Sequence, residues 1–151
     1  MSSWQNHSID ERISMIQSVA QDHNIEDNAV EKDWWVTVVL KALFNTSCGK
    51  WLLFKGGTSL SKGWNLINRF SEDIDISIGR NFFEDVLNLP FAKCENNNQV
   101  KKLRKASRDY IHGTLSAELD AELLKMGVKG YTIMNETVTG EPPRPIDHDS
   151  D

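Results

Sequence analysis

The chain has 151 residues, a length that predicts one domain with a core of its own. With 17 Lys and Arg against 22 Asp and Glu, the formal net charge is −5, which excludes a strongly basic protein of the histone type but leaves room for a local basic patch. Two cysteines, Cys48 and Cys94, are too few for a disulfide framework or a cysteine-only zinc site, so a reducing, cytoplasmic location is expected. The first residues show no signal peptide and no apolar run is long enough to span a bilayer, so no membrane association is expected.

Two helices are predicted before the first strand. Ser8 and Glu11 have the spacing of a capping box, and apolar residues then recur at helical spacing as far as Ala20. Asn28 and Glu31 are expected to form a second capping box. The broad apolar face of the second helix is expected to be buried and comprises Val30, Trp34, Val38, Ala42 and Phe44, widened by Trp35, Val39 and Leu43.

Two strands are predicted on either side of a glycine turn. The apolar run 51–54 predicts a buried strand. Gly56-Gly57 interrupts it, and a short helix over 58–66 and a polar loop over 68–72 are expected to follow. Residues 73–78 alternate between polar and apolar, which predicts a strand with both aspartates on one face and three isoleucines on the other.

The C-terminal half is predicted to be mainly helical, with apolar residues at helical spacing from Val100 to Leu123 and Gly113 as a weak point. The first turns of this helix are basic. The simplest interpretation is a helix face exposed to solvent, and the alternative is that these residues contact nucleotide phosphates or an RNA backbone. Around it we expect a short helix at 81–88, a loop at 95–99, a strand at 131–139 and an irregular acidic tail at 141–151.

The turn after the first strand has the chemistry of a triphosphate site. Gly56 and Gly57 let the backbone approach a phosphate closely and direct N–H groups at it. Thr58 and Ser59 add hydroxyl groups at the start of the predicted short helix, and Lys62 lies on that helix. We therefore expect these five residues to bind nucleotide, and the flanking Lys55 and Arg69 are further candidates to neutralise triphosphate charge.

The second strand has the chemistry of a metal site. Asp73 and Asp75, two residues apart on a strand, project side by side. Mg²⁺ (or Mn²⁺) prefers one or two carboxylates together with substrate phosphate oxygens. Asp73 and Asp75 are therefore the predicted metal ligands and catalytic residues.

The ordered pair of a glycine turn and an Asp-x-Asp strand resembles the DNA polymerase beta-like nucleotidyltransferase superfamily. The strings Phe54–Lys62 and Arg69–Ile76, preceded by Glu31–Val36, closely resemble the AbiEii/AbiGii nucleotidyltransferase toxins of abortive-infection and type IV toxin–antitoxin systems. The resemblance implies an α/β (α+β) fold, with a small mixed sheet packed by helices and an N-terminal helical segment. It also implies a nucleotidyltransferase-like domain over 1–140 that lacks the family's C-terminal half.

The same resemblance implies metal-dependent transfer of a nucleoside monophosphate from an NTP to an acceptor hydroxyl on tRNA or protein. The biological role would be that of a toxin restrained by a separate antitoxin protein. Self-association is expected as well, because a missing half would leave apolar faces uncovered.

Departures from the family pattern leave alternatives open. Glu136 is a candidate third carboxylate, and Lys105 with Asp109 imitates a family motif but fits an exposed ion pair better. One alternative is a catalytically incomplete or degenerate member that binds nucleotide or a partner protein. The other is a structural interaction domain without a ligand.

Overall fold

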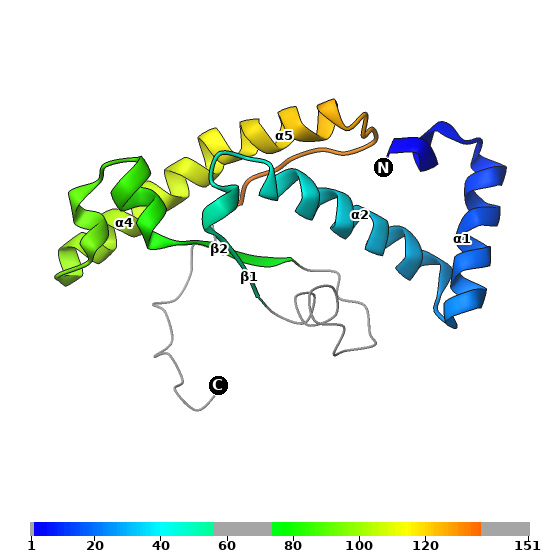
Figure 1. Ribbon diagram of the computed structural model, residues 1–151, viewed down its shortest axis with the longest axis horizontal. Helices are drawn as coiled ribbons and strands as arrows, with labels where there is room; N and C mark the ends of the chain where they lie inside the picture. Colours follow the sequence, from blue (N-terminus) through cyan, green and yellow to red (C-terminus); the bar gives the residue numbers. More distant parts are fainter. Residues whose placement is uncertain (1, 56–73, 137–151) are drawn as a thin grey trace.

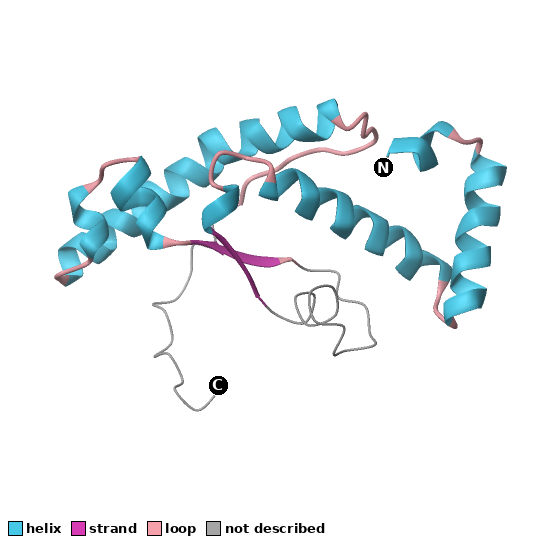
Figure 2. Cartoon of the chain, in the orientation of Figure 1, coloured by secondary structure: helices cyan, strands magenta, loops and turns pink. Residues whose placement is uncertain are grey.

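The computed structural model describes residues 2–55 and 74–136. The expected turn, short helix and loop over 56–72, Asp73 and the tail over 141–151 therefore lie outside the described residues. Figure 2 shows a mainly helical chain with one small sheet along one side of the helices. In chain order the elements are η1 (Ser2–Asn6), α1 (Ile9–His23), α2 (Asp27–Phe44), η2 (Gly49–Trp51), β1 (Leu52–Lys55), β2 (Asp75–Ile78), η3 (Phe82–Val86), η4 (Pro90–Lys93), α4 (Asn97–Tyr110), η5 (Ile111–Leu115) and α5 (Ser116–Lys125).

The expected α+β class is confirmed, and the sheet that the structure describes is an antiparallel pair of strands. Figure 1 shows α4, η5 and α5 as one long helical band, with α2 alongside α5 and α1 at a steep angle to α2. A core cluster of Val38, Ala42, Leu123 and Val128 joins α2 to α5. In the described ranges, no helix has the length and apolar character needed to cross a membrane.

The capping box at the start of α1 is confirmed. The Ser8 side chain accepts from the Glu11 backbone N–H at 3.2 Å, and the Glu11 carboxylate accepts from the Ser8 N–H at 3.1 Å. The apolar stripe of α1 is less buried than its spacing suggests, since Ile9 is 72% exposed while Ala20 is buried. This helix contacts α2 and leaves most of its apolar residues at the surface.

Two expectations for α2 are wrong. The helix begins at Asp27 with Glu26 as its N-cap and no side-chain cap, so Asn28 and Glu31 lie inside the first turns rather than forming a capping box. Phe44 is 44% exposed, because it lies about 200° around the helix from the buried Ala42.

The N-terminal 3-10 turn is hydrogen-bonded to the segment that follows α5. The Gln5 side chain donates to the Lys129 carbonyl oxygen and accepts from the Lys129 N–H, both at 2.8 Å. The Trp4 ring lies 4.9 Å from the ring of Trp34 on α2, centroid to centroid. These contacts tie the first residues to α2 and to the segment after α5, a tie that no local pattern predicts.

The strands follow a tight turn in which Gly49 is required. A Cβ at Gly49 would lie 2.1 Å from the carbonyl oxygen of Phe44, well inside van der Waals contact. β1 then begins one residue later than expected and is buried on one face only, with Leu53 54% exposed.

A polar network holds this turn against the C-terminal band. The Ser47 hydroxyl donates to the Glu118 carboxylate at 2.8 Å and lies 3.1 Å from the Tyr110 hydroxyl. Burial raises the pKa of Tyr110 to about 12. Tyr110 also packs with Phe82 and Phe83 in the core beneath the sheet.

The C-terminal half departs from expectation in two places. α4 begins at Asn97, inside the expected loop, because the Asn96 side chain caps it by accepting from the Gln99 N–H at 2.9 Å. The strand expected over 131–139 is absent from its described part, 131–136, which packs on α2 and α5 in an irregular conformation. The weak point at Gly113 is confirmed as a π-helical turn.

We predict that Gly49→Ala costs about 2–3 kcal/mol of unfolding free energy, because the new methyl group must displace backbone atoms. Gly113→Ala is the matched control: nothing lies within 4 Å of its added Cβ, and alanine is the better helix former by about 0.5–1 kcal/mol. Urea unfolding of both variants measures the difference. Equal effects of the two substitutions would contradict the steric argument.

We predict a pH-dependent contribution of Tyr110 to stability. A free tyrosine titrates near pH 10 and the folded pKa is about 12, so this contribution is complete below pH 10 and is lost as the pH rises toward 12. Tyr110→Phe should therefore show a smaller loss of unfolding free energy than the wild type between about pH 10 and 12. If the unfolding free energies of Tyr110→Phe and the wild type fall equally between about pH 10 and 12, the raised pKa of Tyr110 is refuted.

Candidate functional site

The two strands present one face to the core and the other outward. The core face consists of Leu52 and Phe54 of β1, opposite Ile78 and Ile76 of β2. Leu52 is buried, and both isoleucines pack against the adjoining core cluster. Because side chains alternate along a strand, this packing forces the remaining residues onto the outer face.

Asp75 lies on that outer face, at the start of β2. Its Cα is paired with that of Lys55, the last residue of β1, and Ser77 pairs with Leu53 on the same face. Both Asp75 and Lys55 are exposed. A carboxylate and an ammonium group therefore stand across from each other at one end of the two-stranded ribbon.

Chain connectivity attaches the rest of the predicted site to the same end. Gly56 follows Lys55 directly, and Asp73 precedes Asp75 by two residues. The remaining predicted residues are part of the same connecting segment, and all of them lie outside the described residues: Gly56, Gly57, Thr58, Ser59, Lys62, Arg69 and Asp73.

The described end of the ribbon offers two kinds of group that suit a triphosphate with a bound metal: a carboxylate for the metal and a positive charge for the phosphates. Asp75 is a hard oxygen donor, the type that Mg²⁺ prefers, and within the described ranges its side chain forms no hydrogen bond or ion pair. Lys55 supplies a positive charge for phosphate oxygens. Across 2–55 and 74–136, no three His, Cys, Asp or Glu residues form a group that could hold a metal.

The other candidate residues have separate locations. Glu136 lies on the irregular segment after α5 and is exposed; its neighbour Asn135 is held by Ser116 at 2.8 Å and by the His112 carbonyl oxygen at 3.2 Å. Lys105 and Asp109 are both on the exposed side of α4.

Of the outer-face residues, Ser77 was not selected from the sequence, whereas Lys55 was already a candidate cation for the triphosphate charge. The position of Ser77 follows from the same period-two pattern as Asp75. The position of Lys55 opposite Asp75 depends on the strand register, which is set by contacts between segments far apart in the sequence.

Comparison with known proteins returned one family. A family model described as "Nucleotidyl transferase AbiEii toxin, Type IV TA system" matches residues 39–146. The match spans both strands of the ribbon and the whole α4–α5 band. No curated protein and no solved structure matched the chain.

Proposed function

The chain belongs to the AbiEii family of nucleotidyltransferase toxins of type IV toxin–antitoxin systems, and from this membership we propose a specific reaction. The protein transfers a nucleoside monophosphate from an NTP to an acceptor hydroxyl, in a divalent-metal-dependent reaction. The acceptor is tRNA or a protein, and the activity is that of a toxin counteracted by a separate antitoxin. The nucleotidyltransferase-like domain comprises 1–140.

The observation that supports this proposal most is the pairing of Lys55 with Asp75. The pairing attaches the glycine turn and the Asp-x-Asp segment to one end of one ribbon, on the side that the core leaves open. A phosphate-binding turn and metal-binding carboxylates must be neighbours if one triphosphate is to contact both.

In the proposed site, Gly56, Gly57, Thr58 and Ser59 bind the triphosphate through backbone N–H groups and hydroxyls. Lys62 and Lys55 would neutralise phosphate charge. These contacts hold the α-phosphorus in line with the acceptor oxygen, which forms the new P–O bond as the bond to pyrophosphate breaks.

The carboxylates of Asp73 and Asp75 are the proposed ligands of Mg²⁺ or Mn²⁺. A bound divalent metal activates an attacking hydroxyl and stabilises the charge of the leaving pyrophosphate. The exposed Asp75 carboxylate has the ligand chemistry for this metal. A cytoplasmic location fits both the NTP supply and the free thiols of Cys48 and Cys94.

The alternative is a member that binds nucleotide but is catalytically incomplete. A two-metal reaction needs enough ligands to fix both ions, and Asp75 is the one carboxylate that the described residues place on the outer face of the ribbon. In that case binding would survive and turnover would be lost.

We predict that Asp75→Asn lowers nucleotide transfer to total RNA or protein more than about 100-fold, because even supporting residues of metal sites cost 10–100-fold. Transfer is measured with each labelled NTP and Mg²⁺. Asp85→Asn is the matched control, since Asp85 is an exposed carboxylate on η3. Equal activity of Asp75→Asn and the wild type would contradict the assignment.

We further predict that millimolar Mn²⁺ with NTP raises the Tm of the wild type by several degrees through mass action, and that Asp75→Asn abolishes the gain. A gain without transfer would favour the catalytically incomplete alternative. An unchanged Tm of the wild type would count against both the proposed transferase and the catalytically incomplete alternative.

A further inference from the structure

The apolar residues and the basic residues of helix α4 lie on different sides of the helix. Its inner side packs into the core through Leu103 and Tyr110, the latter 8% exposed. At 100° per residue the basic residues fall on the opposite side of the helix, and all of them are exposed: Lys101, Lys102, Arg104, Lys105 and Arg108. One acidic residue, Asp109, leaves α4 with a net charge of +4 in a chain of −5.

Like-charged pairs on α4 outnumber its one opposite-charged pair, Lys105 with Asp109. Lys101 and Lys105 are four residues apart, as are Arg104 and Arg108, and like charges at this spacing repel. Within the described residues, none of the five basic side chains of α4 forms a hydrogen bond or an ion pair. The arrangement is therefore unfavourable for the protein alone and is relieved by an anion with several charges.

The positive surface continues toward the sheet. Arg80 and Arg104 line one hollow of about 300 Å³, together with Ile78 at the end of β2. A guanidinium N–H of Arg80 donates to the Lys93 carbonyl oxygen at 3.4 Å. We define the α4 basic face as Arg80 together with the five basic residues of α4. Ile78, where the α4 basic face meets the sheet, lies three residues from Asp75, about 10 Å along β2. The two side chains are on different faces of the ribbon, Ile78 on the core face and Asp75 on the outer face.

We propose that the α4 basic face binds the phosphate backbone of an RNA strand and holds that strand beside β2. This inference rests on the proposed function in one respect only: the bound RNA is taken to be the acceptor of the transferred nucleotide. Basic side chains repeating every three or four residues suit a polymer with a repeating negative charge.

A lipid surface fits this face less well. A helix that binds a membrane buries its apolar side in the lipid, whereas the apolar side of α4 is packed into the protein core. None of the large apolar residues that are exposed in the described structure belongs to α4. The α4 basic face therefore lacks the apolar anchor of a membrane-binding helix.

The test is binding of a fluorescein-labelled single-stranded RNA of about 20 nucleotides and mixed sequence to the full chain, by anisotropy, between about 50 and 300 mM salt. Lys101→Gln plus Lys105→Gln should weaken binding roughly 20-fold at 0.1 M salt and reduce the slope of log K against log salt by about 1.4. The Tm should change little, because the two substitutions remove the repulsion between Lys101 and Lys105 together with the attraction between Lys105 and Asp109.

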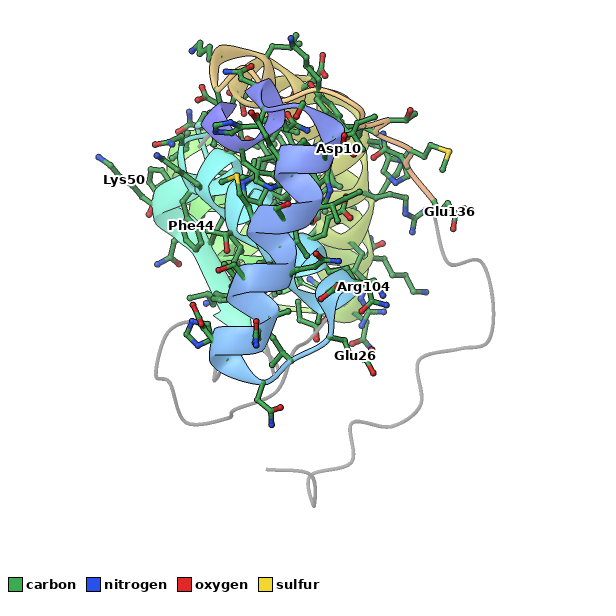
Figure 3. The ribbon with its side chains drawn as sticks, turned by 90° about the vertical axis from the view of Figure 1, so that its right-hand side faces the viewer. Asp10, Glu26, Phe44, Lys50, Arg104 and Glu136 are labelled. Atoms are coloured by element: carbon green, nitrogen blue, oxygen red, sulfur yellow. The ribbon has the colours of Figure 1, made fainter. Side chains whose placement is uncertain are left out.

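Lys41→Gln plus Lys50→Gln is the matched control, with the same change in charge at two exposed lysines of α2 and η2. Figure 3 shows Lys50 and Arg104 projecting on opposite sides of the molecule. The control should bind the RNA like the wild type.

Three results would overturn the proposal: no RNA binding by the wild type, equal weakening by the two double variants, or binding through α4 to phosphatidylserine vesicles but not to RNA. The assay contains neither NTP nor divalent metal. A failure of nucleotide transfer would therefore not change its result, and the two proposals can fail separately.

Discussion

The antiparallel pairing of β1 with β2 is the constraint that positions the candidate site of this protein. Leu52 and Ile78 meet on the core side, and this contact fixes the register, since a slip of one residue would turn every side chain to the opposite face. With the register fixed, Asp75 must lie outward and opposite Lys55. The segment between the strands, which carries most of the predicted site, is then attached at both ends to one end of the ribbon.

The ribbon is in turn held by the helices at its other end. Gly49 allows the chain to turn back against Phe44 at the end of α2, and the Ser47 hydroxyl joins that turn to Tyr110 of α4 and Glu118 of α5. The elements that position Asp75 are therefore the same elements that carry the α4 basic face. A site for nucleotide on the ribbon and a surface for a polyanion on α4 would share one rigid frame.

The sequence predicts features that depend on neighbouring residues. The capping box of Ser8 and the outward face of Asp75 follow from spacings of three and two residues. The start of α2 was mispredicted because Glu26, Asp27 and Asn28 are adjacent polar residues and the sequence alone does not select among them.

Features that depend on distant contacts could not be predicted. Residues 131–136 have the composition of a strand, yet they pack on α2 and α5 without a strand partner. The position of Lys55 opposite Asp75 needs the register, and the link between Gln5 and Lys129 joins the two ends of the described chain. For the candidate site, the sequence thus supplied the residue types and the face of Asp75, while the structure supplied the pairing that brings the two attachment points together.

The most direct test of that arrangement is a crystal structure with Mn²⁺ and a non-hydrolysable NTP analogue, with the metal located by its anomalous signal. We expect a metal peak bound by the carboxylates of Asp73 and Asp75, with the triphosphate against Gly56–Ser59. A bound nucleotide whose metal lies away from Asp75 would contradict this expectation.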